Sequence, residues 1–190
     1  QKMGIEPPIF GHHVEDITKI IDSAAFDELK SNVTKSKAET LTGIIGGPPC
    51  PDFSVAGKNK GKDGENGRLS GTYVSLICKT LPDFFLFENV KGLYRTAKHR
   101  EFFDLLKSKL CKAGYVLTEQ LINSIEFGAP QDRDRIILIG FRKDVAERLN
   151  LPYKGNELLE FDWNRNKLFS RDVFNLPWPK TDTYRENVPI

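Results

Sequence analysis

The chain has 190 residues, of which 39% are hydrophobic and 28% charged, and its 28 basic and 26 acidic residues leave a formal net charge of +2. This length and composition predict one globular domain, or one domain that lacks a piece, and exclude disordered, collagen-like and coiled-coil proteins. The near-zero charge excludes a surface that is basic all over, although a local basic patch for nucleic acid is compatible with it, and no apolar run is long enough to cross a bilayer.

The spacing of apolar residues predicts alternating helices and strands. Helices are expected over residues 16–40, 69–81 and 100–112, and strands over residues 41–47, 83–89, 115–126 and 135–141, with a long loop at 48–67 and a polar connection at 127–134. Strand 83–89 is apolar almost throughout, which is typical of a parallel strand covered on both faces. The alternation favours an α/β fold with a mostly parallel sheet, in which ligands bind at the carboxyl ends of strands.

The segment Gly46-Gly47-Pro48-Pro49-Cys50-Pro51 follows the first expected strand. Two glycines allow a tight turn and three prolines fix the path of the backbone, so the loop would hold Cys50 rigidly at the rim of the sheet as a nucleophile. A buried, inert cysteine in a proline-rich turn is the alternative. The other two cysteines, Cys78 and Cys111, fall inside expected helices and are interpreted as packing residues. Three cysteines without C-x-x-C spacing indicate a reducing cytoplasm, no disulfide framework and no metal site.

The loop after Cys50 carries spaced cations among glycines, namely Lys58, Lys60, Lys62 and Arg68. A flexible, cationic loop beside a nucleophile suits closure over a phosphate-bearing substrate, although such loops are also common as plain solvated loops. The loop contains no G-x-x-x-x-G-K-[ST] string and is therefore not a P-loop.

Two further motifs lie at the ends of expected strands. Glu88 follows four apolar residues, and apolar surroundings would raise its pKa towards neutral and let it donate a proton. A structural role in capping the next turn is the alternative. In Gln131-Asp132-Arg133-Asp134-Arg135, two guanidiniums two residues apart point the same way if the segment is extended, which suits an anion or a base carbonyl. A surface ladder of ion pairs would have the same sequence.

Taken together, these strings resemble the cytosine-5 DNA methyltransferase family. Pro-Pro-Cys followed by Phe53 and Ser54, then Phe87-Glu88-Asn89-Val90, then Gln-x-Arg-x-Arg occur in the order of the family and at close to its usual gaps. Asp16-Ile17 resembles the motif that contacts the adenine of S-adenosylmethionine. Asn66-Gly67-Arg68-Leu69 resembles a motif whose leucine packs near the cofactor, although the family commonly has arginine in place of Asn66.

The resemblance implies a Rossmann-like class I fold with a partial doubly wound sheet, and it implies a role for each motif. Cys50 would add to C6 of cytosine, Glu88 would bind or protonate N3, and Arg133 and Arg135 would hold the base. The base must leave the duplex to reach Cys50, so base flipping is implied. The residues implied at the S-adenosylmethionine site are Asp16, Ile17, Pro49 and Leu69, and those implied at DNA phosphates are Ser54, Lys58, Lys60 and Arg68.

The chain also departs from the family pattern. No Phe-x-Gly-x-Gly loop precedes Asp16, and no full target-recognition region follows Arg135. We therefore expect residues 1–150 to be a partial catalytic domain, and residues 151–190, rich in proline and aromatic residues, to connect to a target-recognition region. The isolated chain is expected to bind S-adenosylmethionine weakly or not at all.

Three readings of function remain open from the sequence. The first is a bacterial, cytoplasmic methyltransferase that acts on double-stranded DNA, associates with the nucleoid through DNA and belongs to a restriction-modification system with a cognate endonuclease. The second keeps the chemistry and changes the substrate to transfer RNA. The third is a non-catalytic DNA-binding or assembly subunit of a split enzyme, with a complementing polypeptide as its partner.

Overall fold

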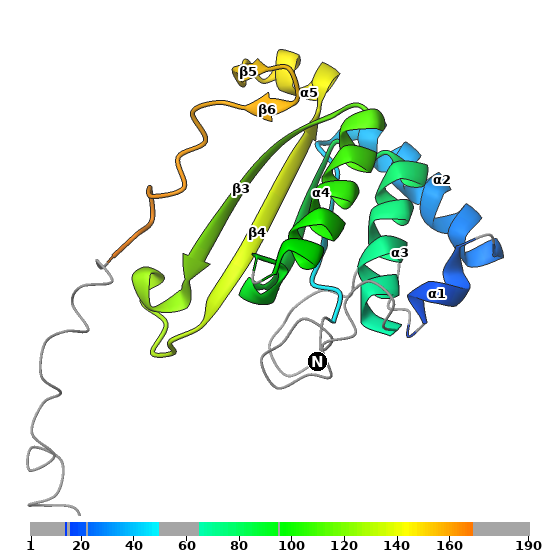
Figure 1. Ribbon diagram of the computed structural model, residues 1–190. Coiled ribbons are helices and arrows are strands. Elements are labelled where there is room, and N and C mark those ends of the chain that lie inside the picture. Colours follow the sequence, from blue (N-terminus) through cyan, green and yellow to red (C-terminus); the bar gives the residue numbers. More distant parts are fainter. Residues whose placement is uncertain (1–13, 15, 22, 50–64, 95, 169–190) are drawn as a thin grey trace, which may run out of the picture.

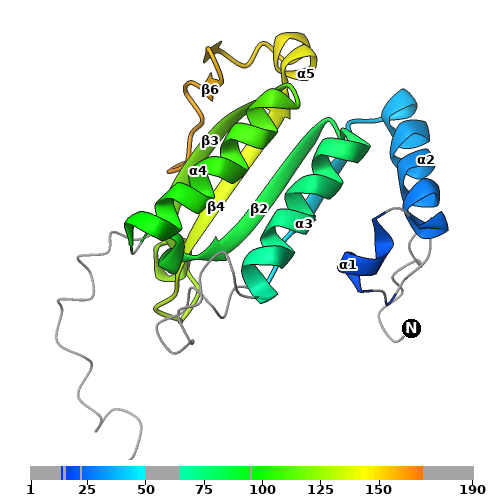
Figure 2. The same cartoon turned by 45° about the vertical axis from the view of Figure 1, so that its right-hand side comes forward.

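The computed structural model describes residues 14, 16–21, 23–49, 65–94 and 96–168, and within them six strands form a single mixed sheet (Figure 1). Helices α3 and α4 lie on one face of the sheet, and α2 packs beside α3 (Figures 1 and 2). The elements follow one another as α1 (Ile17–Ile20), α2 (Ala24–Glu39), β1 (Gly43–Gly46), α3 (Glu65–Thr80), β2 (Phe84–Val90), the 3-10 helix η3 (Lys91–Tyr94), α4 (Ala97–Lys112), β3 (Tyr115–Asn123), the 3-10 helix η4 (Ser124–Phe127), β4 (Asp134–Arg142), α5 (Lys143–Arg148), β5 (Tyr153–Lys154) and β6 (Glu157–Leu158).

The strand order is β1-β2-β4-β3-β6-β5, and the sheet is not mostly parallel as the sequence suggested. β1 and β2 are parallel, but β4 inserts between β2 and β3 and runs antiparallel to both. The reason is the short connection from β3 to β4. A parallel return needs a crossover of roughly a dozen residues or more, usually a helix, whereas η4 and a few turn residues can only reverse the chain.

The core lies between the sheet and helices α3 and α4. Phe85 and Phe87 of β2 are 0% and 1% exposed, and their rings pack against aromatic rings of neighbouring elements. The alternate residues of β2 are only half-buried, so the expected burial of both faces of this strand is wrong for the described part of the chain. The helices of that part cover one face, and Glu88 projects from the other.

The tight packing around one core glycine gives a first stability prediction. Gly140→Ala should lower the free energy of unfolding by about 1–3 kcal/mol, because overpacking forces neighbours to shift. A Cβ on Gly140 would lie 2.2 Å from Cε1 of Phe85 and 2.9 Å from Cδ2 of Leu117. Gly71→Ala in α3 is the matched control. Among the described residues, nothing lies within 4 Å of its added Cβ, so this change should raise the free energy of unfolding by about 0.5–1 kcal/mol through helix propensity.

Urea unfolding followed by circular dichroism measures both variants. A Gly140→Ala protein as stable as the native one would contradict the tight contact between β4 and β2.

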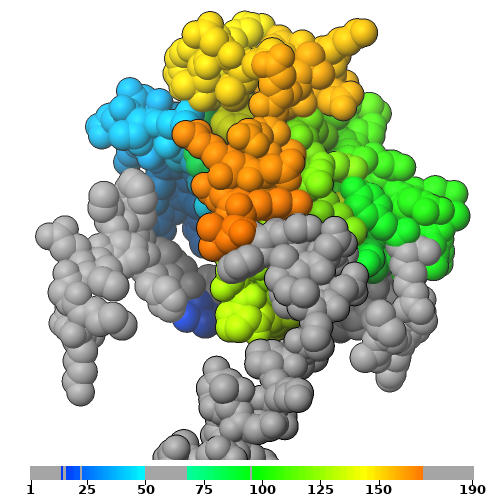
Figure 3. Space-filling model, turned by 90° about the vertical axis from the view of Figure 1, so that its left-hand side faces the viewer, coloured from blue at the N-terminus to red at the C-terminus, as the bar shows by residue number. Residues whose placement is uncertain are grey.

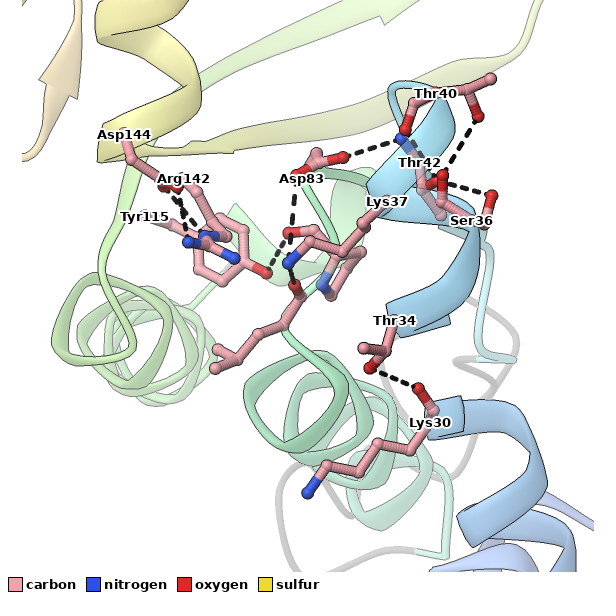
Figure 4. A network of polar contacts seen from close by, with 12 residues as sticks. Lys30, Thr34, Ser36, Lys37, Thr40, Thr42, Asp83, Tyr115, Arg142 and Asp144 are labelled. Carbon is pink, nitrogen blue, oxygen red and sulfur yellow. Dashed lines mark hydrogen bonds and ion pairs between the residues drawn. The ribbon is translucent and has the colours of Figure 1, made fainter. Parts of the chain in front are cut away.

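A polar network fixes the amino ends of β1 and β2 (Figure 4). The carboxylate of Asp83 accepts a hydrogen bond from the backbone nitrogen of Thr42 at 2.9 Å, and Lys37 of α2 lies 3.9 Å from the same carboxylate. Burial lowers the pKa of Lys37, with the cation of Arg142 adding to the effect. The Tyr115 hydroxyl donates to the carbonyl of Pro82 at 2.7 Å. These contacts fix the starts of neighbouring strands relative to one another, and the positions of their carboxyl ends follow from this.

Helix limits differ from the sequence prediction at capping residues. The single helix expected over 16–40 is two helices, because the side chain of Ser23 caps α2 by accepting from the nitrogen of Phe26. Thr96 caps α4 in the same way, so this helix begins before Arg100. α3 begins at Glu65, earlier than expected, and β3 ends at Asn123, where the 3-10 helix η4 takes over.

Regular structure continues beyond residue 141, where the sequence pattern fades. Ala146 of α5 and Leu158 of β6 form a small apolar cluster with Val116 of β3. The chain then crosses the side of the molecule seen in Figure 3. Its Trp163 donates from the indole nitrogen to the Thr118 hydroxyl of β3 at 3.1 Å. A few side chains of residues 151–168 thus attach this segment to the sheet and its small apolar cluster, namely Leu151, Tyr153, Leu158, Phe161 and Trp163. No helix in the described part of the chain is long and apolar enough to span a membrane.

Candidate active site

The carboxyl ends of β1 and β2 and the start of β4 meet at one edge of the sheet, the lower edge in Figure 1. Parallel pairing aligns the ends of β1 and β2, and antiparallel pairing brings the start of β4 to the same place. Val90 lies opposite Arg135 in this register. This edge gathers two of the sequence-predicted motifs, Glu88 with Asn89 and Arg133 with Arg135.

Glu88 and Arg135 form the shortest ion pair of the site. Oε1 of Glu88 lies 2.6 Å from Nε of Arg135 and 4.0 Å from Nη2 of Arg133. Both guanidiniums thus point to the same carboxylate, as the two-residue spacing predicted. The side chain of Glu88 is 34% exposed and that of Arg135 19%. The apolar surroundings expected for Glu88 are not found, because strand alternation turns Phe85 and Phe87 to the opposite face and places arginines beside the carboxylate.

The start of the proline loop is fastened to β2. The side-chain amide of Asn89, which is 2% exposed, donates to the carbonyl of Pro48 at 3.2 Å. A Cβ on Gly47 would lie 2.8 Å from Oε2 of Glu88, so the loop passes directly against the carboxylate. Sequence reasoning did not assign a site role to Asn89. The sequence feature that could have indicated a role for Asn89 is its place next to Glu88 in the Glu-Asn-Val string.

Tyr73 of α3 fastens β1 to β2 just before this loop. Its hydroxyl lies 2.8 Å from the carbonyl of Leu86 and 3.2 Å from that of Ile44, and burial raises the pKa of this phenol. Its ring lies 2.4 Å from the Cβ that Gly46 lacks, so Gly46 must be glycine for the strand to pass the ring. Cys50 itself lies outside the described residues, as do Ser54, Lys58 and Lys60.

The family model of C-5 cytosine-specific DNA methylases matches residues 11–187. The chain belongs to this family. It is 52% identical to the type II methyltransferase M.NmeDI of Neisseria meningitidis serogroup C, over 95% of this chain and 41% of that protein. It is 34% identical to the orphan methyltransferase M.SPRI of Bacillus phage SPR, over 78% of this chain and 34% of that protein. The chain thus spans about two fifths or less of the length of these methyltransferases.

Solved structures agree with the methylase fold. A protein described as a DNA modification methyltransferase, encoded within a prophage (E. coli), superposes with a TM-score of 0.53 at 26% identity, over 76% of this chain and 36% of that one. The Dnmt2 methyltransferase of S. pombe superposes with a TM-score of 0.50 at 16% identity, over 86% of this chain and 43% of that one. The fold is the Rossmann-like class I fold of S-adenosylmethionine-dependent methyltransferases.

The residues expected at the cofactor of a methylase lie around α1 and the start of α3. Asp16 caps α1 and accepts hydrogen bonds from the nitrogen and hydroxyl of Thr18 at 2.9 and 2.8 Å. These bonds lower the pKa of Asp16, and the cations of Lys19 and Arg68 add to the effect. The side chain is therefore an ionised acceptor. Arg68, which was assigned to DNA from the sequence, thus acts electrostatically on the predicted cofactor residue.

The other predicted cofactor residues supply apolar surface near the same end of the molecule. Ile17 is half-buried against the core, and Leu69 lies half-buried in the first turns of α3, which packs against α1. Pro49 is exposed beyond the carboxyl end of β1. Asp16, Ile17 and Leu69 thus lie on two helices that pack against each other, and their role at the cofactor stays a prediction.

The two cysteines in helices fit their packing role. Cys78 and Cys111 are half-buried and packed against the core, and burial raises the pKa of each thiol. A raised pKa leaves little thiolate at neutral pH, so neither side chain is a competent nucleophile. Within the described ranges, no cluster of three or more histidine, cysteine or acidic side chains could hold a metal ion.

Proposed function

We propose that the protein transfers a methyl group from S-adenosylmethionine to carbon 5 of cytosine in double-stranded DNA. The observation that carries the proposal is the Glu88 carboxylate at the end of β2, held 2.6 Å from Arg135 and in contact range of the backbone that leads to Cys50. This chemistry needs an acid, cationic groups and a nucleophile. One edge of the sheet brings together the carboxyl group of Glu88, the two guanidiniums and the start of the loop that carries Cys50. Membership of the methylase family supports the same reaction.

Cys50 would act as the nucleophile. Its thiolate forms a bond to C6 of the cytosine, and the displaced electron pair moves towards N3, which turns C5 into an enamine carbon. S-adenosylmethionine, when bound, would supply the methyl group that C5 takes and would leave as a neutral thioether that keeps the electron pair of the broken sulfur–methyl bond. Transfer of the C5 proton to water then returns the electron pair to the ring, breaks the bond between Cys50 and C6 and releases the Cys50 thiolate.

Glu88 and the two arginines would bind the base and stabilise the negative charge that develops on it. The carboxyl group of Glu88 binds N3 and donates a proton or hydrogen bond as electron density moves there. Arg135 orients Glu88, and Arg133, which is 47% exposed, is free to reach the base from the solvent side. Asp16, Ile17, Pro49 and Leu69 would hold the cofactor on the neighbouring side of the edge.

The loop after Cys50 would contact DNA. Ser54, Lys58 and Lys60 of this loop, together with Arg68 of α3, suit backbone phosphates, which are the main source of affinity for duplex DNA. The target base must leave the stack to reach Cys50. We infer that residues 151–190 lead to a target-recognition region, which the native protein carries itself or obtains from a complementing polypeptide. We also place it in the bacterial cytoplasm, on nucleoid DNA, with a cognate restriction endonuclease as system partner.

Methyl transfer with radiolabelled cofactor tests the function directly. The protein at its native length should label duplex DNA, and digestion to nucleosides should give 5-methylcytosine. Transfer RNA is the comparison substrate. Preferential labelling of transfer RNA would move the substrate to RNA, and labelling of neither by a protein that still binds DNA would favour the non-catalytic subunit.

A further inference from the structure

A polar cluster around one buried side chain lies next to the two arginines in the connection between β3 and β4. At its centre is Asn123, the last residue of β3, which is 2% exposed. Its side-chain amide nitrogen lies 2.6 Å from Oδ1 of Asp132 and 3.0 Å from Oδ1 of Asp134. One amide therefore donates both of its protons to two carboxylates, and these carboxylates are the residues on either side of Arg133.

Asn123 also fixes the backbone of the connection between β3 and β4. Its side-chain oxygen accepts from the nitrogen of Ile125 at 3.0 Å, and its own nitrogen donates to Oε2 of Glu126 at 3.4 Å. The next residue, Ser124, donates from its backbone nitrogen to the carbonyl of Arg133 at 3.0 Å. The two ends of the connection are thus tied together at the point where Arg133 leaves the turn.

The charges around Asn123 explain why an amide is needed there. The carboxylates of Asp132 and Asp134 both lie within 3.0 Å of the Asn123 amide nitrogen, and they would repel each other without this donor between them. Lys91 lies 3.0 Å from Oδ2 of Asp134 and compensates one of them. Arg135 donates from Nη1 to the backbone carbonyl of Asp134 at 2.7 Å. The position of the Asp134 backbone therefore helps to fix the guanidinium of Arg135, which forms the ion pair with Glu88.

We propose that Asn123 is a positioning residue of the active site, whose two amide protons hold Asp132 and Asp134 so that Arg133 and Arg135 face Glu88. The inference rests on the proposed function and deepens it. Asn123 does not touch the base or the cofactor in this role. It acts through the backbone on either side of Arg133 and through the carbonyl that Arg135 binds.

The test uses Asn123→Asp and Asn123→Ala in the protein at native length. The aspartate has the size of asparagine, but its ionised form has no proton to donate. The charged groups around it are Asp132 and Asp134 from the β3–β4 connection and β4, Glu126 from η4 with its partner Lys167, Lys91 from η3, and the two site arginines. Two adjacent carboxylates raise the pKa of the introduced acid, which therefore gains a donating O–H as the pH falls.

At pH 8 both variants should lose about tenfold to a hundredfold in kcat, the range expected when reacting groups are misplaced by about 1 Å. The KM for S-adenosylmethionine should not change, because Asn123 lies on the arginine side of the edge. At pH 6 the rate of Asn123→Asp, taken relative to the native protein at the same pH, should recover several-fold. Asn123→Ala should show no recovery. Equal pH dependence of the two variants, or native kcat in Asn123→Ala, would overturn the proposal.

Two further arms keep the test decisive. If either single variant fails to fold, the exchanged pair Asn123→Asp/Asp132→Asn returns an amide to the cluster and should recover rate at pH 8; an exchange without recovery counts against the proposal. The Nε–Hε NMR signals of Arg133 and Arg135 give a readout that needs no turnover. They should move in Asn123→Asp between pH 8 and pH 6 and remain unmoved in Asn123→Ala. A protein without methyl transfer but with this shift would refute the proposed function and leave the positioning role standing.

Discussion

Replacement of Cys50 by alanine should lower methyl transfer to duplex DNA by about a thousandfold or more, the scale on which loss of a covalent nucleophile acts. Without the thiolate no bond to C6 forms, and C5 stays too poor a nucleophile to take the methyl group. The steady-state rate with radiolabelled cofactor measures the loss. The native protein should also form a covalent adduct with DNA that carries 5-fluorocytosine, because fluorine cannot leave as a proton does in the last step.

Cys78→Ser and Cys111→Ser are the controls for this experiment. Both thiols are half-buried with raised pKa values and pack against the core, so their replacement should leave the adduct intact. An adduct on denaturing gels that survives Cys50→Ser would refute the assignment of the nucleophile.

Glu88→Gln should reduce kcat by about 10²- to 10⁴-fold, the usual contribution of a positioned general acid. The glutamine keeps the shape of the side chain but can neither give a proton to N3 nor hold the charge of Arg135, whose Nε lies 2.6 Å away in the native protein. The KM for S-adenosylmethionine should change little. Single-turnover rates at saturating DNA separate loss of chemistry from loss of binding.

The chain offers a matched control in Glu119→Gln. Glu119 is also a strand carboxylate in ion-pair contact, 3.1 Å from Lys107, and its side chain is 28% exposed against 34% for Glu88. It lies on β3 with Tyr94 as a further partner at 2.7 Å, away from the proposed site. Glu119→Gln should keep near-native methyl transfer. If both variants lost activity equally, the loss in Glu88→Gln would be a structural effect, and the catalytic role of Glu88 would be refuted.

The sequence alone determined the motifs and the end of the sheet at which they lie. Two apolar runs, one before Gly46-Gly47 and one leading into Glu88-Asn89, predicted two strands, and β1 and β2 confirmed both. The chemistry assigned to their carboxyl ends stays a prediction. The two-residue spacing of Arg133 and Arg135 predicted that both guanidiniums face one way, and both point to Glu88. These features are local, since spacing along one strand is set by backbone geometry and does not depend on its neighbours.

Only the tertiary structure decided what lies beside each motif. The sequence placed Glu88 among apolar residues, whereas antiparallel insertion of β4 next to β2 put Arg135 against it. The same insertion made the sheet mixed and closed the short turn that Asn123 holds. Which strand pairs with which, and which face a helix covers, depend on contacts between residues far apart in the chain. Periodicity reports burial but not the partner, so the charged neighbours of Glu88 and the bonds of Asn89 and Asn123 could not be read before the strands were assembled.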